Sequence, residues 1–290
     1  MPRRTSRAPQ FETYLAVEGA PSTMARAVRR SAFKIQVRFL GGLTQRQKNA
    51  FKRAANRWSR VIVGDLPSVV VDGEEIDDVL ILAEGTAIDG PGEVLGQAGP
   101  SHLRPRSAGI SAFLPVKGDM SFDTADLRAM EQDGTLNDVI THEMGHVLGI
   151  GTVWDRKRLL KGEGGRNPTF IGAAAVREYQ TLRGGGKVRG VPVEATGGAG
   201  TRDSHWRESI FVNELMSGFV ESRGNPLSRV TVASLEDMGY RVNLDAAEPY
   251  VLPDLFAIAE RGDLVPHIAP IDRGRVLPVI PTVLPNTSLR

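Results

Sequence analysis

The order of hydrophobic and polar residues predicts several strands in the first half of the chain. In residues 33–40 apolar and polar side chains alternate, which is the period of a strand with one buried face. Residues 78–85 and 93–99 are short apolar runs between glycines and prolines, and they predict two more strands. Residues 109–116 predict another strand, and residues 119–123 a weaker one. This part of the chain is therefore expected to form a sheet.

Helical periodicity appears first in residues 44–62. Thr44 and Gln47 match a capping box at the start of this segment. Its apolar residues fall on one helical face, as expected for a helix packed against a sheet. They are Phe51, Ala54, Ala55, Trp58, Val61 and Ile62. A helix behind the predicted sheet follows from this pattern.

Two further helices are predicted in the second half of the chain. Residues 168–182 have the composition of a helix opened by Pro168. Residues 228–238 form another, with Ser228 as its N-cap and Gly239 as its C-terminal glycine. Together with the predicted strands, these helices give a mixed α+β fold as the expected fold class.

The helix predicted for residues 135–148 carries the most informative residues. Thr135 can cap it, and Gly149 is placed to end it or to turn the chain sharply. Its apolar stripe consists of Leu136, Val139, Ile140, Val147 and Leu148. The stretch from Asp138 to Thr152 reads DVITHEMGHVLGIGT.

Within this helix His142 and His146 are one turn apart, and Glu143 follows the first of them. Both imidazoles can therefore reach one ion, about 2 Å from each nitrogen. A glutamate beside them can take a proton from zinc-bound water, whose pKa the metal lowers to about 7. An ordinary helix that has these residues by chance is the alternative. The cap before the motif and the glycine after it favour the zinc interpretation.

Two histidines do not complete a catalytic zinc site, which needs a third protein ligand. The chain has no cysteine, so its other histidines are the first candidates. His102 lies in a proline-rich turn and His267 in a proline-rich tail, where a solvated histidine is the simpler interpretation. His205 follows a glycine-rich loop that can carry it back to the metal. Its residue type alone still favours an ordinary histidine, just as Met216, eleven positions later, reads as a core methionine.

The combination of these motifs resembles leishmanolysin-type metzincin proteases and their bacterial relatives. HEMGHVLG is followed, 59 positions after His146, by HW at His205 and then by NELMSGF. The similarity runs from about residue 33 to residue 242 and includes VLGQAGP, GDMSFDTADL and LEDMGY. In that family an inserted segment delays the third zinc histidine, and a methionine forms a tight turn beneath the zinc.

The resemblance implies a role for each matching residue. His142, His146 and His205 would be zinc ligands, Glu143 the general base and Met216 the turn methionine. It also implies an edge strand along the cleft, against which a peptide substrate lies antiparallel. The candidates for that strand are Val94, Leu95, Gly96, Gln97 and Ala98, for which an ordinary sheet strand is the alternative.

The resemblance also implies how the chain is organised. Residues 33–248 would form a two-lobed, metzincin-like catalytic domain, with an upper lobe at 33–150 and a less regular lower lobe at 151–248. Residues 1–32, which are rich in arginine, are expected to be a disordered lead. Residues 249–290 contain seven prolines and are expected to be extended and packed on the domain, or loose.

The amino-acid composition limits which binding partners can be expected. The chain has 290 residues and a net charge of +2, which is too balanced to indicate a nucleic acid or an anionic membrane. No stretch has the length of a signal-peptide core or of a membrane span, so a soluble protein is expected, either cytoplasmic or secreted by another route. The oligomeric state is left open. The acidic residues 71–78 could bind Ca²⁺, but a solvated charged turn is the simpler interpretation.

The expected function is that of a zinc-dependent endopeptidase acting on protein or peptide substrates. One alternative is a latent or inactive binding protein with the same fold. Another is a zinc hydrolase that acts on a non-peptide amide. A fourth zinc ligand supplied by the protein would favour the latent state, because it would close the open coordination position.

Overall fold

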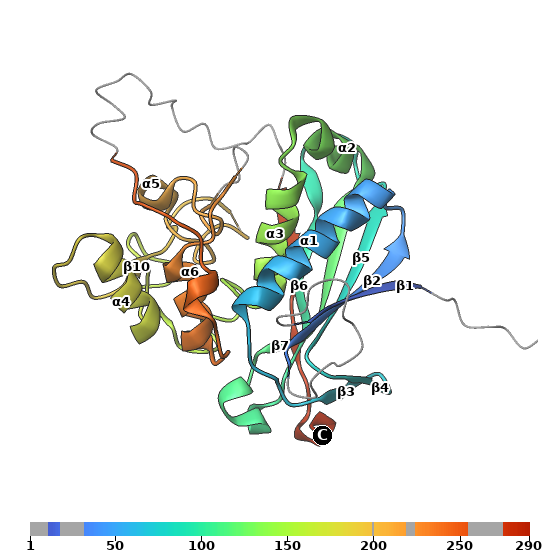
Figure 1. Cartoon of the computed structure of the whole chain (residues 1–290), viewed down its shortest axis with the longest axis horizontal. Coiled ribbons are helices and arrows are strands. Elements are labelled where there is room, and N and C mark those ends of the chain that lie inside the picture. The colour runs from blue at the N-terminus through green and yellow to red at the C-terminus, as the bar shows by residue number, and fades with distance from the viewer. Residues whose placement is uncertain (1–10, 18–31, 199, 219–223, 255–274) are drawn as a thin grey trace, which may run out of the picture.

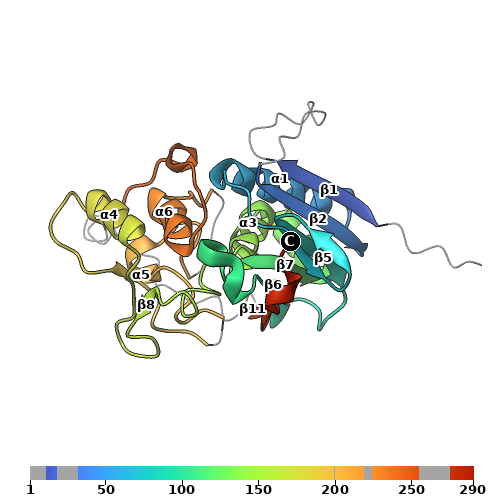
Figure 2. The ribbon, with the colours of Figure 1, turned by 90° about the horizontal axis from the view of Figure 1, so that it is seen from below.

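A computed structural model describes residues 11–17, 32–198, 200–218, 224–254 and 275–290 of the chain. Most of the predicted lead lies outside the described residues, as does the part of the tail that contains His267. The described chain is a mixed α+β structure with a sheet on one side and short helices and loops on the other (Figures 1 and 2).

A twisted mixed sheet forms the first side. In the described residues it has seven strands, in the order β1-β2-β5-β7-β6-β11, with β12 also paired to β6. Strands β2, β5 and β7 are parallel, whereas β1 is antiparallel to β2 and β6 is antiparallel to β7. The bounds are Glu12–Val17 (β1), Lys34–Gly41 (β2), Val79–Thr86 (β5), Val94–Leu103 (β6), Pro115–Asp123 (β7), Arg275–Pro278 (β11) and Thr282–Val283 (β12).

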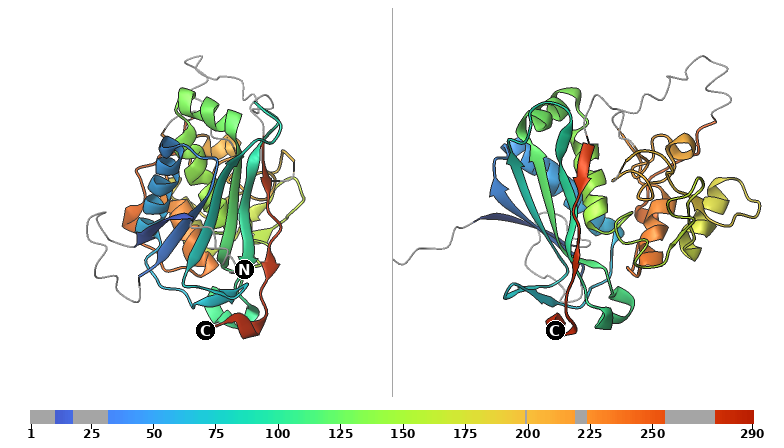
Figure 3. Two further views of the ribbon diagram at one scale, coloured as in Figure 1. Left: turned by 90° about the vertical axis from the view of Figure 1, so that its right-hand side faces the viewer. Right: turned by 180° about the vertical axis from the view of Figure 1, so that it is seen from behind.

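Helices α1 (Gln45–Val61) and α3 (Leu136–Val147) cover one face of the sheet and pack against each other (Figure 3). The capping box expected for α1 is present, with Thr44 and Gln47 each accepting a hydrogen bond from the other's backbone N–H. Trp58 of α1 donates from its indole nitrogen to the Thr141 carbonyl of α3 at 2.9 Å. A third helix, α2 (Thr124–Asp133), leads from β7 to α3. These contacts fix α3 behind the sheet.

A small hairpin packs on part of the other face of the sheet. Its strands are β3 (Val69–Val71) and β4 (Glu74–Ile76). Hairpin side chains and the sheet residues Leu80 and Val116 form a separate apolar cluster, which Leu284 near the C-terminus also contacts. This face of the sheet is therefore buried around Leu80 and Val116, whereas Gln36 and Arg38 of β2 remain partly exposed.

The second side consists of short elements held by a shared core. They are the strands Leu160–Lys161 (β8), Thr169–Phe170 (β9) and Val191–Pro192 (β10) and the helices Ala173–Leu182 (α4), Glu208–Phe211 (α5) and Arg229–Met238 (α6). Trp154 packs on Trp206 and Phe170, with ring centroids 4.8 and 5.0 Å away. These rings belong to the same apolar cluster as the face of the sheet that carries α1 and α3. The division into two lobes remains a prediction.

Three segments differ from the expectations for them. Glu12–Val17, within the expected disordered lead, is strand β1, because it pairs with β2 and its Tyr14 hydroxyl donates to Asn56. In residues 109–116 the chain first forms a 3-10 turn (Arg106–Ser111), and β7 begins only at Pro115. The weaker strand expected at 119–123 is the end of that same β7.

The start predicted for the helix at residues 168–182 was also wrong. Helix α4 begins at Ala173, whereas Thr169 and Phe170 after Pro168 are in β9. The carboxylate of Asp237 in α6 accepts hydrogen bonds from the backbone N–H groups of Ala174 and Ala175. A residue more than sixty positions away therefore caps α4, which no local pattern reveals.

Candidate metal centre

Three histidine side chains meet at one point beside the sheet. The Nε2 atoms of His142, His146 and His205 lie 2.9 to 3.0 Å from one another. The first two come from α3, and His205 comes from the loop before α5. All three are buried. The structure thus brings together the three histidines that the sequence singled out.

The other ring nitrogen of each histidine faces a backbone carbonyl. Nδ1 of His142 lies 2.6 Å from the Leu215 oxygen, that of His146 2.8 Å from the Ile150 oxygen, and that of His205 3.0 Å from the Thr201 oxygen. A carbonyl oxygen can only accept, so each Nδ1 carries the hydrogen and donates. Each neutral ring then has an unprotonated Nε2 with its lone pair directed at the other two.

Burial keeps these rings neutral. It lowers the pKa of His142 to about 3 and that of His146 to about 4. Burial and the two neighbouring rings hold the pKa of His205 well below its usual range. Three lone pairs facing one another in a buried site repel, and no proton is held between them. A cation at their centre removes this repulsion, and their separation suits Zn–N bonds of about 2.0 Å.

The turn after α3 places the second histidine. Gly149 ends the helix with a positive φ of 106°, and its N–H donates to the His146 carbonyl. This turn brings the Ile150 carbonyl back to the His146 ring. At Gly151 an added Cβ would lie 2.0 Å from the Ser204 oxygen. The glycine therefore lets the loop that carries His205 approach the end of α3.

The loop around His205 is organised by a buried glutamate. The Glu194 carboxylate accepts hydrogen bonds from the backbone N–H groups of Ala195, Thr196 and Glu208. Its own N–H donates to the His205 carbonyl at 2.9 Å. These donors hold the pKa of Glu194 below its usual value despite its burial. Sequence reasoning missed this residue.

Met216 lies in a tight turn that contacts α3. The Ser217 N–H donates to the Glu214 carbonyl across the turn. An added Cβ on Gly145 would lie 2.8 Å from the Met216 sulfur, so the methionine packs against α3 between its two histidines. The residue before it, Leu215, provides the carbonyl that faces His142.

A second buried glutamate, Glu214, supports this turn. One carboxylate oxygen accepts the Met216 N–H at 2.6 Å. The other accepts the backbone N–H and hydroxyl of Ser228 and the hydroxyl of Thr231. Burial raises the pKa of Glu214. It was not among the predicted site residues, although its position two residues before Met216 was visible in the sequence.

The histidines open into a cavity of about 920 Å³ that Glu143 also lines. Burial raises the pKa of Glu143 to about 8. In the described residues, the groups that gather here as candidate metal ligands are the three histidines and no fourth side chain. Three histidine ligands would leave one coordination position for water or substrate, as a catalytic zinc site requires.

The predicted substrate strand also lines this cavity. Val94, Leu95 and Ala98 of β6 border it, whereas Gly96 and Gln97 are not among its lining residues. The resemblance implies an edge strand here, but the outer edge of β6 is paired with β11 in this region. The proline-rich tail is thus packed on the domain here, the first of the two alternatives expected for it.

The remaining candidate residues lie elsewhere. His102 is in β6, where its ring faces the Ser101 hydroxyl. The structure gives no support for calcium at residues 71–78: Glu74 is paired with Arg38 and Asp77 with Lys34, and the Asp78 carboxylate accepts two backbone N–H groups. A solvated charged turn, the simpler interpretation, fits the exposed residues 72–75 but not Asp78, which is buried.

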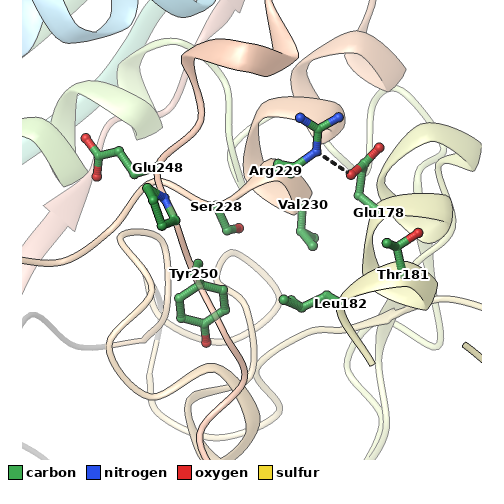
Figure 4. Close-up of a pocket in the computed structure, with 9 residues that line it drawn as sticks. Glu178, Thr181, Leu182, Ser228, Arg229, Val230, Glu248 and Tyr250 are labelled. Carbon is green, nitrogen blue, oxygen red and sulfur yellow. Dashed lines mark hydrogen bonds and ion pairs between the residues drawn. The ribbon is translucent and has the colours of Figure 1, made fainter. Parts of the chain in front are cut away.

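A second cavity, of about 280 Å³, lies between α4, α6 and the segment at Glu248–Tyr250. Figure 4 shows its lining, with Arg229 paired to Glu178 at the rim. No histidine borders it. This cavity lies among the short helices of the second side and is separate from the three histidines.

None of the described helices combines the length and the apolar content that a membrane span requires.

Comparison with known proteins agrees with the motifs. A family model described as leishmanolysin matches residues 110–254, which is half of the chain and includes all three histidines. The chain is 27% identical over 191 residues to leishmanolysin of Leishmania donovani, which covers 63% of this chain and 30% of that protein. It is 41% identical over 64 residues to a leishmanolysin-like peptidase of Drosophila melanogaster, covering 22% of this chain and 9% of that protein.

The chain therefore spans less than a third of the length of these relatives. Neither relative is bacterial, so these comparisons do not support the expected similarity to bacterial members. This chain belongs to the leishmanolysin family of peptidases.

Proposed function

We propose that this chain is a zinc-dependent endopeptidase. The observation that carries the proposal is the convergence of three unprotonated Nε2 atoms in a cavity that Glu143 also lines. Membership of a family named for a peptidase supports the same activity. His142, His146 and His205 would hold the zinc ion. Zinc bound there would polarise a substrate carbonyl and make a water molecule more acidic.

Glu143 would move the protons. As a carboxylate it takes one proton from the attacking water while the water oxygen forms a bond to the carbonyl carbon. When the C–N bond breaks, the same proton is delivered to the leaving amine nitrogen. A bound cation favours the carboxylate form, which offsets the burial that raises the pKa of Glu143 in its absence.

The carbonyl groups of Leu215, Ile150 and Thr201 would orient the ligands. Each accepts the Nδ1 hydrogen of one histidine and so keeps Nε2 free for the metal. Met216 would act by packing under α3 rather than by binding the ion. The outer edge of β6, at residues 94–98, would hold an extended peptide by main-chain hydrogen bonds after displacement of β11, which is paired there.

The test is cleavage of a mixed-sequence peptide library by zinc-loaded protein, compared with Glu143→Gln. We expect wild type to cleave and Glu143→Gln to be slower by about 100-fold or more, because the general base is lost. The zinc content of both proteins should be equal, since Glu143 is not a proposed ligand.

Glu236→Gln is the matched control, because Glu236 is exposed on α6 and the substitution is chemically the same. It should cleave as wild type does. Equal rates for Glu143→Gln and wild type would contradict the proposed role of Glu143. A loss of activity in Glu236→Gln as well would indicate a general defect in the protein.

A further inference from the structure

We propose that strand β11, Arg275–Pro278, is an intramolecular inhibitor that occupies the peptide-binding edge of β6. The inference rests on the proposed function, because it names how access to that same site is regulated. The chain itself supplies the occupant of the cleft. Release of β11 would be needed before an extended substrate could bind.

The first observation is the pairing of β6. Its inner edge is hydrogen-bonded to β7, so only the outer edge could receive another strand. At residues 94–98 that outer edge is taken by β11, with Val276 opposite Gly96 and Leu277 opposite Gln97. A strand edge offers one set of N–H and C=O groups. A peptide that pairs with residues 94–98 must therefore displace β11.

The second observation is the position of β11 in the cavity. Arg275, Val276 and Pro278 line the same cavity as the three histidines and Glu143, as does Val279 just beyond the strand. On the opposite side the strand approaches the loop that leads to His205. An added Cβ on Gly200 would lie 3.3 Å from the Val276 oxygen and 3.4 Å from Pro278. Strand β11 thus fills the space between β6 and that loop.

The direction of β11 suits an inhibitor. It runs parallel to β6, whereas the family resemblance implies that a substrate runs antiparallel. Its peptide groups therefore have the opposite polarity to those of a substrate at the same edge. Pro278 has no N–H to donate, and the pairing ends there. A strand in this orientation occupies the edge without being presented for cleavage as a substrate would be.

The strand is also built to be displaced. It has four residues, and its register shifts between Arg275 and Val276. The chain after it is held separately: β12 pairs with β6 at His102 and Leu103, and the Arg290 N–H donates to the Ser68 carbonyl at 2.9 Å. Strand β11 can therefore leave β6 while the last residues remain attached.

The experiment locks β11 in place with a disulfide. Gln97→Cys with Leu277→Cys joins register partners, and neighbouring strands about 4.8 Å apart suit a disulfide. Neither residue lines the cavity. The chain has no other cysteine, so the bond is unambiguous. The matched control, His102→Cys with Thr282→Cys, joins β12 to β6 at residues that do not line the cavity.

The main readout is binding rather than hydrolysis. Dye-labelled mixed-sequence peptides are titrated onto zinc-loaded protein in a Glu143→Gln background, and anisotropy is measured before and after reduction. We expect the oxidised Gln97→Cys, Leu277→Cys protein to bind about ten-fold more weakly than its reduced form, because a locked strand cannot yield to a competitor. Oxidation of the β12 control should leave binding unchanged.

A second variant covers failure of the disulfide to form. Val276→Gly with Leu277→Gly weakens β11 by removing strand-forming side chains. It should bind the peptides more tightly than the parent protein and, with Glu143 restored, cleave them faster. Equal binding in the locked, reduced and weakened proteins would overturn the proposal and make β11 an ordinary sheet strand. Absence of peptide binding in all of them would overturn it as well.

The same set of proteins separates the two proposals. Lock-dependent binding without hydrolysis by any protein that retains Glu143 would support the inhibitor and contradict the endopeptidase. Hydrolysis at equal rates in the locked and reduced proteins would support the endopeptidase and contradict the inhibitor.

Discussion

The Nδ1 atom of His142 lies 2.6 Å from the carbonyl oxygen of Leu215, a residue 73 positions further along the chain. This hydrogen bond ties the middle of α3 to the turn that contains Met216. It fixes which nitrogen of His142 carries the hydrogen, and so which one faces the other two histidines. The proposed metal centre therefore depends on contacts between the two sides of the molecule as well as on the helix itself.

Glu214→Gln should weaken both the fold and the metal site. The carboxylate accepts hydrogen bonds from Met216, Ser228 and Thr231 inside the protein, and an amide nitrogen cannot accept. A donor left without a partner costs about 1–3 kcal/mol in the free energy of unfolding. Because the Leu215 carbonyl shifts with the turn, zinc affinity should also fall by about 10- to 100-fold.

Urea unfolding and competition with a zinc-binding dye measure these two effects. Glu236→Gln, on an exposed position of α6, should change neither. Unchanged zinc affinity in a folded Glu214→Gln protein would show that the turn does not position His142.

Gly145→Ala should destabilise the protein, although alanine normally stabilises a helix interior relative to glycine by about 0.5–1 kcal/mol. The new Cβ would lie 2.8 Å from the Met216 sulfur and 3.0 Å from the Trp58 ring. Overpacking of this kind costs about 1–3 kcal/mol. Adding Met216→Ala should recover part of the loss, because it removes the atoms that clash. A double-mutant cycle in urea measures this coupling, and strictly additive effects would contradict the proposed contact.

His205→Ala should lower zinc affinity by more than the 10- to 100-fold expected for loss of an outer hydrogen-bond partner, because a ligand is lost. Wild type should also melt at a lower temperature after zinc is removed by a chelator, whereas the variant should respond much less. At a free zinc concentration of about 100 times Kd, the bound ion stabilises the folded state by about 2.7 kcal/mol. His102→Ala is the control, and a similar loss of affinity in it would argue against a specific role for His205.

The contribution of Asp78 to the free energy of unfolding should decrease as pH rises. Burial raises its pKa to about 7, from 3.8 in the unfolded chain, even though Leu66 and Lys34 donate backbone hydrogen bonds to it. The folded state therefore binds a proton more tightly than the unfolded state. The associated stability is fully present below pH 3.8 and is lost as pH rises through 7.

Asp78→Asn removes this dependence. Between about pH 4 and pH 7.5 the free energy of unfolding of wild type should fall relative to that of the variant, by up to about 4 kcal/mol. Other titrating groups are common to both proteins and cancel in this difference. Parallel pH profiles for the two proteins would show that the pKa of Asp78 is not raised.

Local sequence rules predicted the ends of those helices whose capping residues lie next to them in the sequence. The capping box of Thr44 and Gln47 predicted the start of α1, and Ser228 and Gly239 predicted both ends of α6. These signals work because cap and capped groups lie within a few residues of each other. The spacing of His142 and His146 is local in the same sense, since one helical turn places both rings on one face.

Tertiary structure decided what depends on partners far along the chain. Strands β1 and β11 form because β2 and β6 supply their hydrogen bonds. Both strands are short, so the alternation of apolar and polar residues within them was too weak to predict them. Helix α4 begins where Asp237 caps it. Glu194 and Glu214 organise the loops at His205 and Met216 through hydrogen bonds to remote or backbone groups. The sequence by itself thus determined which residues can bind a metal, because ligand chemistry and helical spacing are local properties. Which carbonyl orients each histidine, and which strand lies on the edge of β6, were decided only by the packing of distant segments.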